Sequence, residues 1–203
     1  SEEAAKELLG SFAGILGTDR AGAYAFWDLL KRQLCWAHLK RDFTKIFERG
    51  GASRRIGKAL LDEEALLFLW WHKLKKGEIQ RSTFQKYVAP LRERVWDLLI
   101  QGISGRNQRT TGTCFELLEV FPAMWTFVSV EGVEPTNNAA ERAIRPAVLW
   151  RKVSFGTHSE AGSRFVERVM TVAASLKRQG RNVLEYLVAA CEARLHGRPA
   201  PSL

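Results

Sequence analysis

The chain has 203 residues, enough for one large domain or for a compact core with an insertion. Hydrophobic residues make up 46% and charged residues 26%, which excludes disordered and collagen-like classes. Lys and Arg number 31 against 22 Asp and Glu, so the formal net charge is +9. This excess favours a polyanionic partner, because cations that neutralise phosphates release condensed counterions. A solvated basic surface is the alternative.

The cysteines and the apolar runs indicate a cellular compartment. An odd number of widely spaced cysteines is atypical of a secreted disulfide framework and favours a reducing cytosol. No apolar run approaches the roughly 18 residues that span a bilayer. The chain opens with Ser1-Glu2-Glu3, where a secretory leader would carry positive charge. We therefore expect a cytoplasmic protein without a membrane partner.

Residues 1–51 show the alternation that is typical of an α/β sheet. Short apolar segments bounded by glycine or polar residues predict two buried strands, at 13–18 and 33–37. Helical patterns surround them, with Gly10 as a stop signal for the first helix. The predicted helices cover residues 2–9, 22–30 and 39–49.

Residues 52–130 are predicted to form a mainly helical insertion. Apolar residues recur at helical spacing up to Gly77, and a second helical stretch covers 82–100, where Pro90 should break or kink it. Residues 102–112 read as a glycine-rich basic loop. An apolar and aromatic segment follows at 114–128 and is interrupted by Pro122.

Residues 131–203 return to clear helical signals and complete the core in this division of the chain. A helix begins at 135–138 and continues to at least Ile144, with Pro146 marking a kink or an end. A long helix runs from Ser159 to Gly180. Asn182, with Glu185 three residues later, resembles the start of a capping box. The predicted core faces are Phe165, Val166, Val169, Met170, Ala173 and Leu176 on one helix, and Leu184, Leu187, Val188, Cys191 and Leu195 on the last.

Asp19 is the first candidate for chemistry. It stands at the carboxyl end of a predicted strand, which is where open α/β sheets place their ligands. Its carboxylate oxygens suit a hard cation such as Mg²⁺. The structural alternative is that Asp19 caps the helix that follows.

Glu141 is the second candidate, as a metal ligand on a basic helix. Four cations and no other acid follow it closely, and phosphodiester chemistry needs such cations because its substrate and transition state are anionic. Structural alternatives are a capping box with Asn138 or an ion pair with Arg145. A solvated face would equally explain the cations, which are Arg142, Arg145, Arg151 and Lys152.

Cys35 and His38 have the spacing of a metal-binding pair. Structural zinc needs four ligands, and the remaining histidines are scattered. A buried strand end is therefore the favoured interpretation of this segment.

Four segments in order resemble the insertion sequence sixty-six family of transposases. They are GILGTDRAGAY (14–24), QLCWAHLKRDF (33–43), VEPTNNAAERAIRP (133–146) and LWRKVSFGTHSEAGSRFVERV (149–169). The resemblance implies a ribonuclease H-like catalytic domain with three acidic residues. Asp19 matches the second acid and Glu141 the third, both as catalytic and metal-binding residues.

The resemblance also implies which part of the catalytic domain is missing from the chain, and which cofactor and partners the protein binds. The first aspartate lies upstream of Ser1, so we expect two of five sheet strands here, reduced stability and no activity of this chain alone. Mg²⁺, with Mn²⁺ as a substitute, is the expected cofactor. The expected partners are DNA (the element's ends and its target), further copies of the chain and helper proteins, in the bacterial cytoplasm at the nucleoid. A non-catalytic DNA-binding or assembly module, or the product of a decayed gene, is the rival interpretation.

Overall fold

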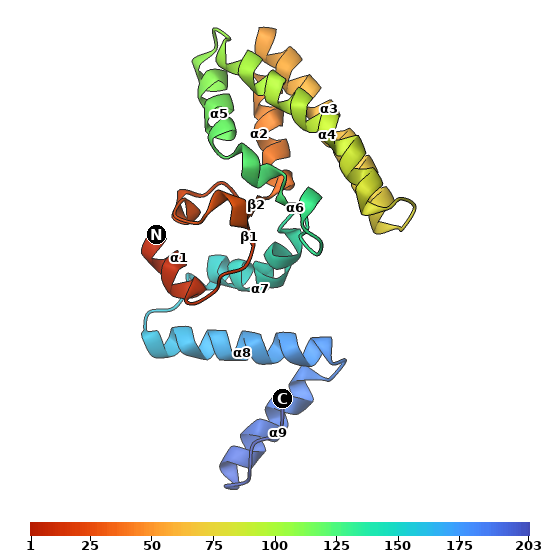
Figure 1. Ribbon diagram of the computed structural model, residues 1–203. Coiled ribbons are helices and arrows are strands. Elements are labelled where there is room, and N and C mark those ends of the chain that lie inside the picture. Colours follow the sequence, from red (N-terminus) through yellow and green to blue (C-terminus); the bar gives the residue numbers. More distant parts are fainter. The chain divides into compact units, whose positions relative to one another are not determined.

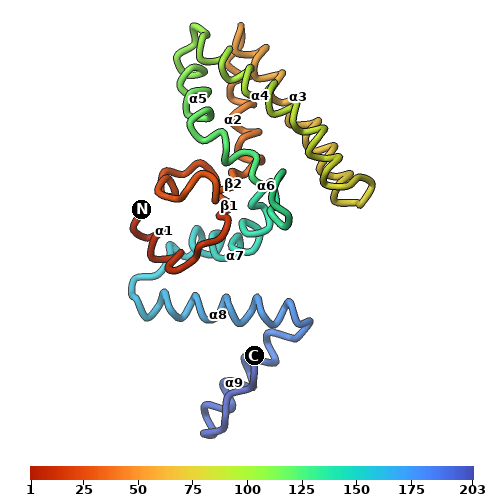
Figure 2. Tube along the Cα trace, in the orientation of Figure 1, coloured from red at the N-terminus to blue at the C-terminus, as the bar shows by residue number.

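The computed structural model describes all residues, Ser1–Leu203. The chain forms two compact units, Ser1–Ala139 and Ala140–Leu203, and each is described by itself. Helices account for 71% of the residues, which confirms the prediction of a helix-rich chain with a small α/β element. Figures 1 and 2 trace the elements from the N-terminus to the C-terminus.

The sheet consists of two parallel strands, β1 (Leu16–Thr18) and β2 (Arg32–Leu34). Both strands were predicted, but each is shorter than expected. Residues 13–15 precede β1 without pairing, and residues 36–37 already belong to the helix after β2. The pairing of two parallel strands is therefore established, while a ribonuclease H-like core around them stays a prediction.

The helix predicted for residues 22–30 is wrong. Two 3₁₀ turns, η1 (Gly22–Tyr24) and η2 (Leu29–Lys31), take its place. Asp28 interrupts the segment, because its backbone is extended (ψ 126°) and its side chain accepts the Leu30 N–H at the start of η2. Two side chains also bond to carbonyl groups of the segment. The guanidinium of Arg32 donates to the Tyr24 carbonyl at 3.3 Å, and the indole N–H of Trp27 donates to the Lys31 carbonyl at 3.0 Å.

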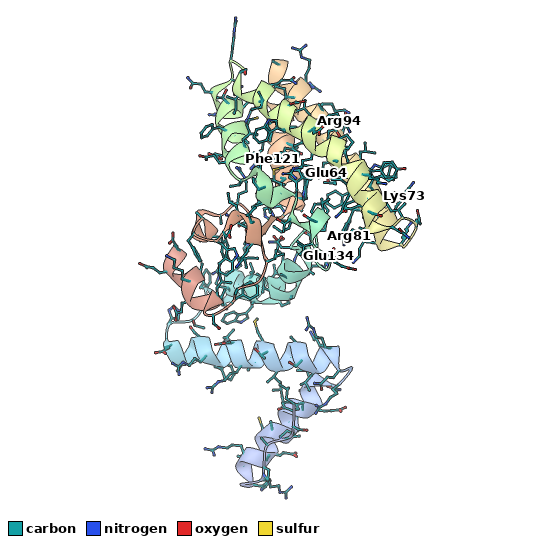
Figure 3. The ribbon with its side chains drawn as sticks, viewed as in Figure 1. Glu64, Lys73, Arg81, Arg94, Phe121 and Glu134 are labelled. Carbon is teal, nitrogen blue, oxygen red and sulfur yellow. The ribbon has the colours of Figure 1, made fainter.

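The first unit contains the helices α1 to α5 and the short helix α6. The short N-terminal helix α1 (Glu2–Leu9) has Ser1 as its N-cap. The helix α2 (Trp36–Glu48) packs against α3 (Gly51–Lys75), α3 packs against α4 (Arg81–Ile103), and α4 packs against α5 (Gln108–Glu119). Figure 1 shows α3 and α4 as a long hairpin. Arg94 of α4, labelled in Figure 3, reinforces this hairpin through two hydrogen bonds to Glu63, of 2.7 and 2.9 Å.

Pro90 does not break α4, and of the two predicted outcomes only a kink stays a prediction. Both Pro90 and Lys86 are exposed, so water can solvate the Lys86 carbonyl that loses its N–H partner. The predicted loop at 102–112 is mostly helical. Its turn is limited to residues 104–107, because Asn107 caps α5 by accepting the Thr110 N–H at 3.1 Å.

The segment after α5 joins the sheet to the helices. It contains η3 (Phe121–Met124), which includes Pro122, and α6 (Thr126–Ser129). The buried side chain of Gln33 donates to the Met124 carbonyl at 3.1 Å and accepts the Phe127 N–H at 2.7 Å. Trp36 donates to the same Met124 carbonyl at 2.7 Å. Residues 52–130 and 1–51 therefore share one hydrophobic core.

Cys114 is buried where α4 and α5 meet, and burial raises the pKa of its thiol to about 11, against a smaller lowering by Arg49. The ordinary pKa is 9.0, so the folded state favours the neutral thiol. This contribution to stability is present below pH 9.0 and is lost as pH rises through about 11. We expect the exposed Cys191 to be alkylated readily at pH 8 while Cys114 stays unmodified, as mass spectrometry would show. Equal rates for the two thiols would contradict this assignment.

The second unit contains most of α7 (Asn138–Ser154), all of α8 (Glu160–Arg178) and α9 (Val183–Leu195). Pro146 lies inside α7 and does not end it. Two predicted helix starts are confirmed. Ser159 caps α8 by accepting the Gly162 N–H, and Asn182 caps α9 by accepting the N–H groups of Leu184 and Glu185. The Glu185 carboxylate accepts from the Asn182 side-chain amide, where a capping box would use the backbone N–H.

The predicted core face of α9 is wrong. Leu184, Val188 and Leu195 are 69%, 48% and 80% exposed. The face of α8 is only partly covered, because Leu176 is buried whereas Phe165 is 67% exposed. Within the second unit, α8 and α9 therefore carry more apolar side chains than they bury. None of the helices combines the length and the hydrophobicity that a membrane span requires.

Candidate active site

Asp19 follows β1 directly and is partly exposed. Its Oδ1 accepts the N–H of Ala21 at 2.9 Å, a short turn in which the side chain bonds two residues ahead. The N-cap of η1 is Ala21, and η1 is not an α-helix. The alternative in which Asp19 caps a following α-helix is therefore wrong, and its carboxylate instead shapes the loop at the strand end.

The buried guanidinium of Arg32 holds this loop from one side. Arg32 donates to Thr18 Oγ1 and to the Asp19 carbonyl, both at 3.0 Å, and is only 3% exposed. Burial lowers the pKa of Arg32, and the negative charge of Asp19 raises it in part. Asp19 thus supplies counter-charge to a buried cation whose hydrogen bonds all go to neutral oxygens.

The next residue, Arg20, holds the loop from the helical side. Its Nε donates to Asp42 of α2 at 3.0 Å, and its Nη1 donates to Glu116 of α5 at 3.1 Å. Asp42 is 9% exposed, so this ion pair is largely shielded from water. Sequence reasoning missed Arg20, Arg32 and Asp42, since no local pattern shows which carboxylate an arginine will reach.

The chain entering α7 lies at the same edge of the sheet as Asp19. The Pro135 carbonyl accepts the Trp36 N–H at 2.9 Å, and the Asn137 N–H approaches Cys35 Sγ at 3.5 Å. Cys35 in turn donates its N–H to the Thr18 carbonyl at 2.7 Å. The carboxyl ends of both strands and the start of α7 therefore meet within the first unit.

Glu141 lies in the first turn of α7, where a carboxylate interacts favourably with the helix dipole. It belongs to the second unit and Asp19 to the first. At helical spacing, Arg145 and Lys152 share the face of Glu141, and Arg142 and Arg151 flank it. All four cations are exposed. Both the capping box with Asn138 and the ion pair with Arg145 stay predictions.

The donor set determines which metal these residues could hold. No group of three or more His, Cys, Asp or Glu side chains is arranged to hold a metal ion. Cys35 is buried at the end of β2, as the strand-end interpretation expected. Two carboxylates from different elements suit a hard, oxygen-preferring cation such as Mg²⁺ better than zinc, which favours sulfur and imidazole.

Comparison with known proteins places the chain among transposases, which are DNA-processing enzymes. The family model described as Transposase IS66 family matches residues 1–164. The chain belongs to this family, as its motifs predicted. It is also similar to the uncharacterized protein y4qI of Sinorhizobium fredii, with 26% identity over 216 residues that cover 96% of this chain. The chain spans 38% of the length of that relative. No solved structure matches the chain.

Proposed function

We propose that this chain forms part of the catalytic domain of a bacterial DNA transposase with a ribonuclease H-like fold and three acidic active-site residues. The observation that carries the proposal is that the chain entering α7 contacts Cys35 and Trp36 at the carboxyl end of β2, the strand that pairs with the one preceding Asp19. Glu141 follows one turn into that helix. Edges formed by the carboxyl ends of parallel strands are the usual ligand sites of α/β sheets.

In this proposal, Asp19 and Glu141 are catalytic residues that hold divalent cations, Mg²⁺ or Mn²⁺ as a substitute. The first acidic residue comes from sequence that this chain does not contain. Such cations, when bound, stabilise the charge that develops on the phosphoryl oxygens. Arg20 and Arg32 act as positioning residues, because they hold the backbone on both sides of Asp19.

The reaction is two successive phosphoryl transfers. Water attacks a phosphorus at the element's end, the P–O3′ bond breaks, and the released oxygen takes a proton to become a 3′-hydroxyl. That hydroxyl then attacks a target phosphodiester, loses its proton, and displaces the target's own 3′-oxygen. Arg142, Arg145, Arg151 and Lys152 bind the DNA phosphates in this proposal, because each brings positive charge to the helix that carries Glu141. Two element ends must be joined, so the active species is at least a dimer, with the element's helper proteins as further partners.

Dependence on a divalent cation tests the proposal. The transposase that contains this chain should cleave a labelled duplex carrying an element end in Mg²⁺ and in Mn²⁺, and should expose a 3′-hydroxyl that a terminal transferase can extend. EDTA should abolish cleavage, and adding back Mg²⁺ should restore it. Cleavage that survives EDTA, or products that end in a 3′-phosphate, would exclude this mechanism.

The second candidate is a non-catalytic DNA-binding or assembly module, including a decayed transposase. It is favoured by the formal net charge of +9, which supports contact with DNA without requiring any catalytic group. Such a module would contact the DNA backbone, and its affinity would fall steeply with salt and depend little on sequence. The carboxylate variants described in the Discussion separate the two candidates.

A further inference from the structure

Two adjoining hollows occupy the end of the helical bundle where α2 turns into α3. The first has a volume of about 350 Å³, and Arg49 and Arg106 lie in its wall together with the turn between α4 and α5. The second is lined by Arg54, Arg55 and Lys58. Gly51 lines both hollows, so they form one continuous surface. We call it the bundle-end patch, and it consists of Arg49, Arg54, Arg55, Lys58 and Arg106.

The positive charge of the bundle-end patch is almost uncompensated. Asp62 is the only carboxylate that lines either hollow, and it pairs with Lys58. Arg49 donates to the hydroxyl groups of Thr110 and Thr113, both at 3.2 Å, and these bonds fix the guanidinium without neutralising it. Arg55 and Arg106 are exposed and form no ion pair. Five cations against one acid leave a net charge of +4 among the side chains that line the two hollows.

The backbone at the bundle-end patch is open to a close approach. Gly50 and Gly51 have φ values of 75° and 53°, and nothing lies within 4 Å of where their Cβ atoms would be. Gly50 is the N-cap of α3 and provides no side-chain hydrogen bond to the first turn. Arg94, on the surface of the same helical bundle, is bound to a carboxylate. In the bundle-end patch only Lys58 is bound to a carboxylate, whereas Arg49 bonds to hydroxyl groups.

We propose that the bundle-end patch binds the phosphate backbone of double-stranded DNA, as a contact surface separate from the cleavage site. A dense, uncompensated group of arginines favours polyanions, since each phosphate that it neutralises releases condensed counterions. Membership of a transposase family identifies the polyanion as DNA, because transposases act on DNA. The inference deepens the proposed function and rests on it only for the identity of the partner. No base-reading element is present among these residues, so the contact positions the duplex and carries no sequence preference.

The test measures binding of a fluorescent 30-base-pair duplex by anisotropy in EDTA, at several salt concentrations, with the transposase that contains this chain. The double variant Arg55→Gln/Arg106→Gln should bind about tenfold more weakly and reduce the slope of log affinity against log salt by about 2. The matched control is Lys76→Gln/Lys86→Gln, which removes the same charge from exposed positions near the Gly77 turn, at the other end of the hairpin. This control should change the slope by less than half as much.

The outcomes distinguish this inference from the proposed function. An unchanged slope in the Arg55/Arg106 variant, or an equal loss in the lysine control, would overturn the inference while leaving metal-dependent cleavage intact. A reduced slope would support the inference even if cleavage were never observed, because EDTA prevents catalysis. A preference for duplex RNA of the same length would overturn the assignment of DNA as the partner. Circular dichroism should show the same helix content in all variants, since every substituted side chain is exposed.

Discussion

Asp19→Asn should reduce Mg²⁺-dependent DNA cleavage by the transposase that contains this chain at least about 1,000-fold. Asparagine keeps an oxygen that can accept the Ala21 N–H, so the turn at the strand end is retained. It lacks the negative charge that compensates the buried Arg32 and that, in the proposed function, holds a divalent cation. Glu141→Gln should have an effect of similar size for the first of these reasons. A gel assay of single-turnover cleavage would measure both.

The chain offers close controls for these substitutions. Asp28 Oδ1 accepts the Leu30 N–H at 2.9 Å, which is the same short turn that Asp19 makes. Asp28→Asn should therefore leave cleavage within about twofold of wild type if the Asp19 carboxylate has a chemical role. For Glu141 the control is Glu185→Gln, since Glu185 also lies in the first turn of a helix. If Asp19→Asn and Glu141→Gln cleaved DNA as fast as wild type and still bound it, the catalytic proposal would be overturned and the assembly module favoured.

Gly57→Ala should destabilise the fold by about 3 kcal/mol. Gly57 is buried in α3, and a Cβ there would lie 2.3 Å from the Phe47 backbone nitrogen and 2.6 Å from its Cα. Both atoms belong to α2 and cannot move independently of that helix. The two helices would have to separate, which would disturb the core that contains Phe43, Ile46 and Leu60. Urea unfolding followed by circular dichroism would measure the loss.

Gly112→Ala is the matched control for Gly57. It lies inside α5, and nothing is within 4 Å of the position of its Cβ. Because alanine reduces the entropy of the unfolded chain, this substitution should stabilise the protein by up to about 1 kcal/mol. Opposite signs for the two substitutions would confirm that helix contact, and not helix propensity, decides the outcome at Gly57. A Gly57→Ala variant as stable as wild type would show that α2 and α3 lie farther apart.

The sequence predicts helix starts and strand positions correctly where residues within one or two turns of the chain cause them. Ser159 and Asn182 begin their helices as predicted, because a capping side chain needs only the N–H groups of the next turn. The positions of the strands before Asp19 and before Cys35 were also predictable, although their lengths were not. The helices α3 and α4 follow from apolar residues at helical spacing, whereas the first part of α5 falls in the segment predicted to be a loop.

Contacts between distant residues decided the features that sequence reasoning missed or misread. The segment of 3₁₀ turns after Asp19 is tied to β2, where the Arg32 guanidinium donates to the Tyr24 carbonyl and to the Asp19 carbonyl. Arg20 reaches Glu116, which is 96 residues away in sequence, so no pattern within one element shows that the loop is held in place. The exposed leucines of α9 show the converse, because an apolar stripe predicts a buried face only where another surface covers it.

The amino-acid sequence by itself determined the family, the order of the elements and the two candidate carboxylates, because these depend on residue identity and short spacing. Only the tertiary structure decided that residues 135–137 contact the carboxyl end of β2, and that five cations from α3 and from the turns before α3 and α5 gather at one end of the bundle. The physical reason is the same for both. Backbone hydrogen bonds and side-chain packing bring together residues that are tens of positions apart, and a linear pattern does not encode which of them will meet.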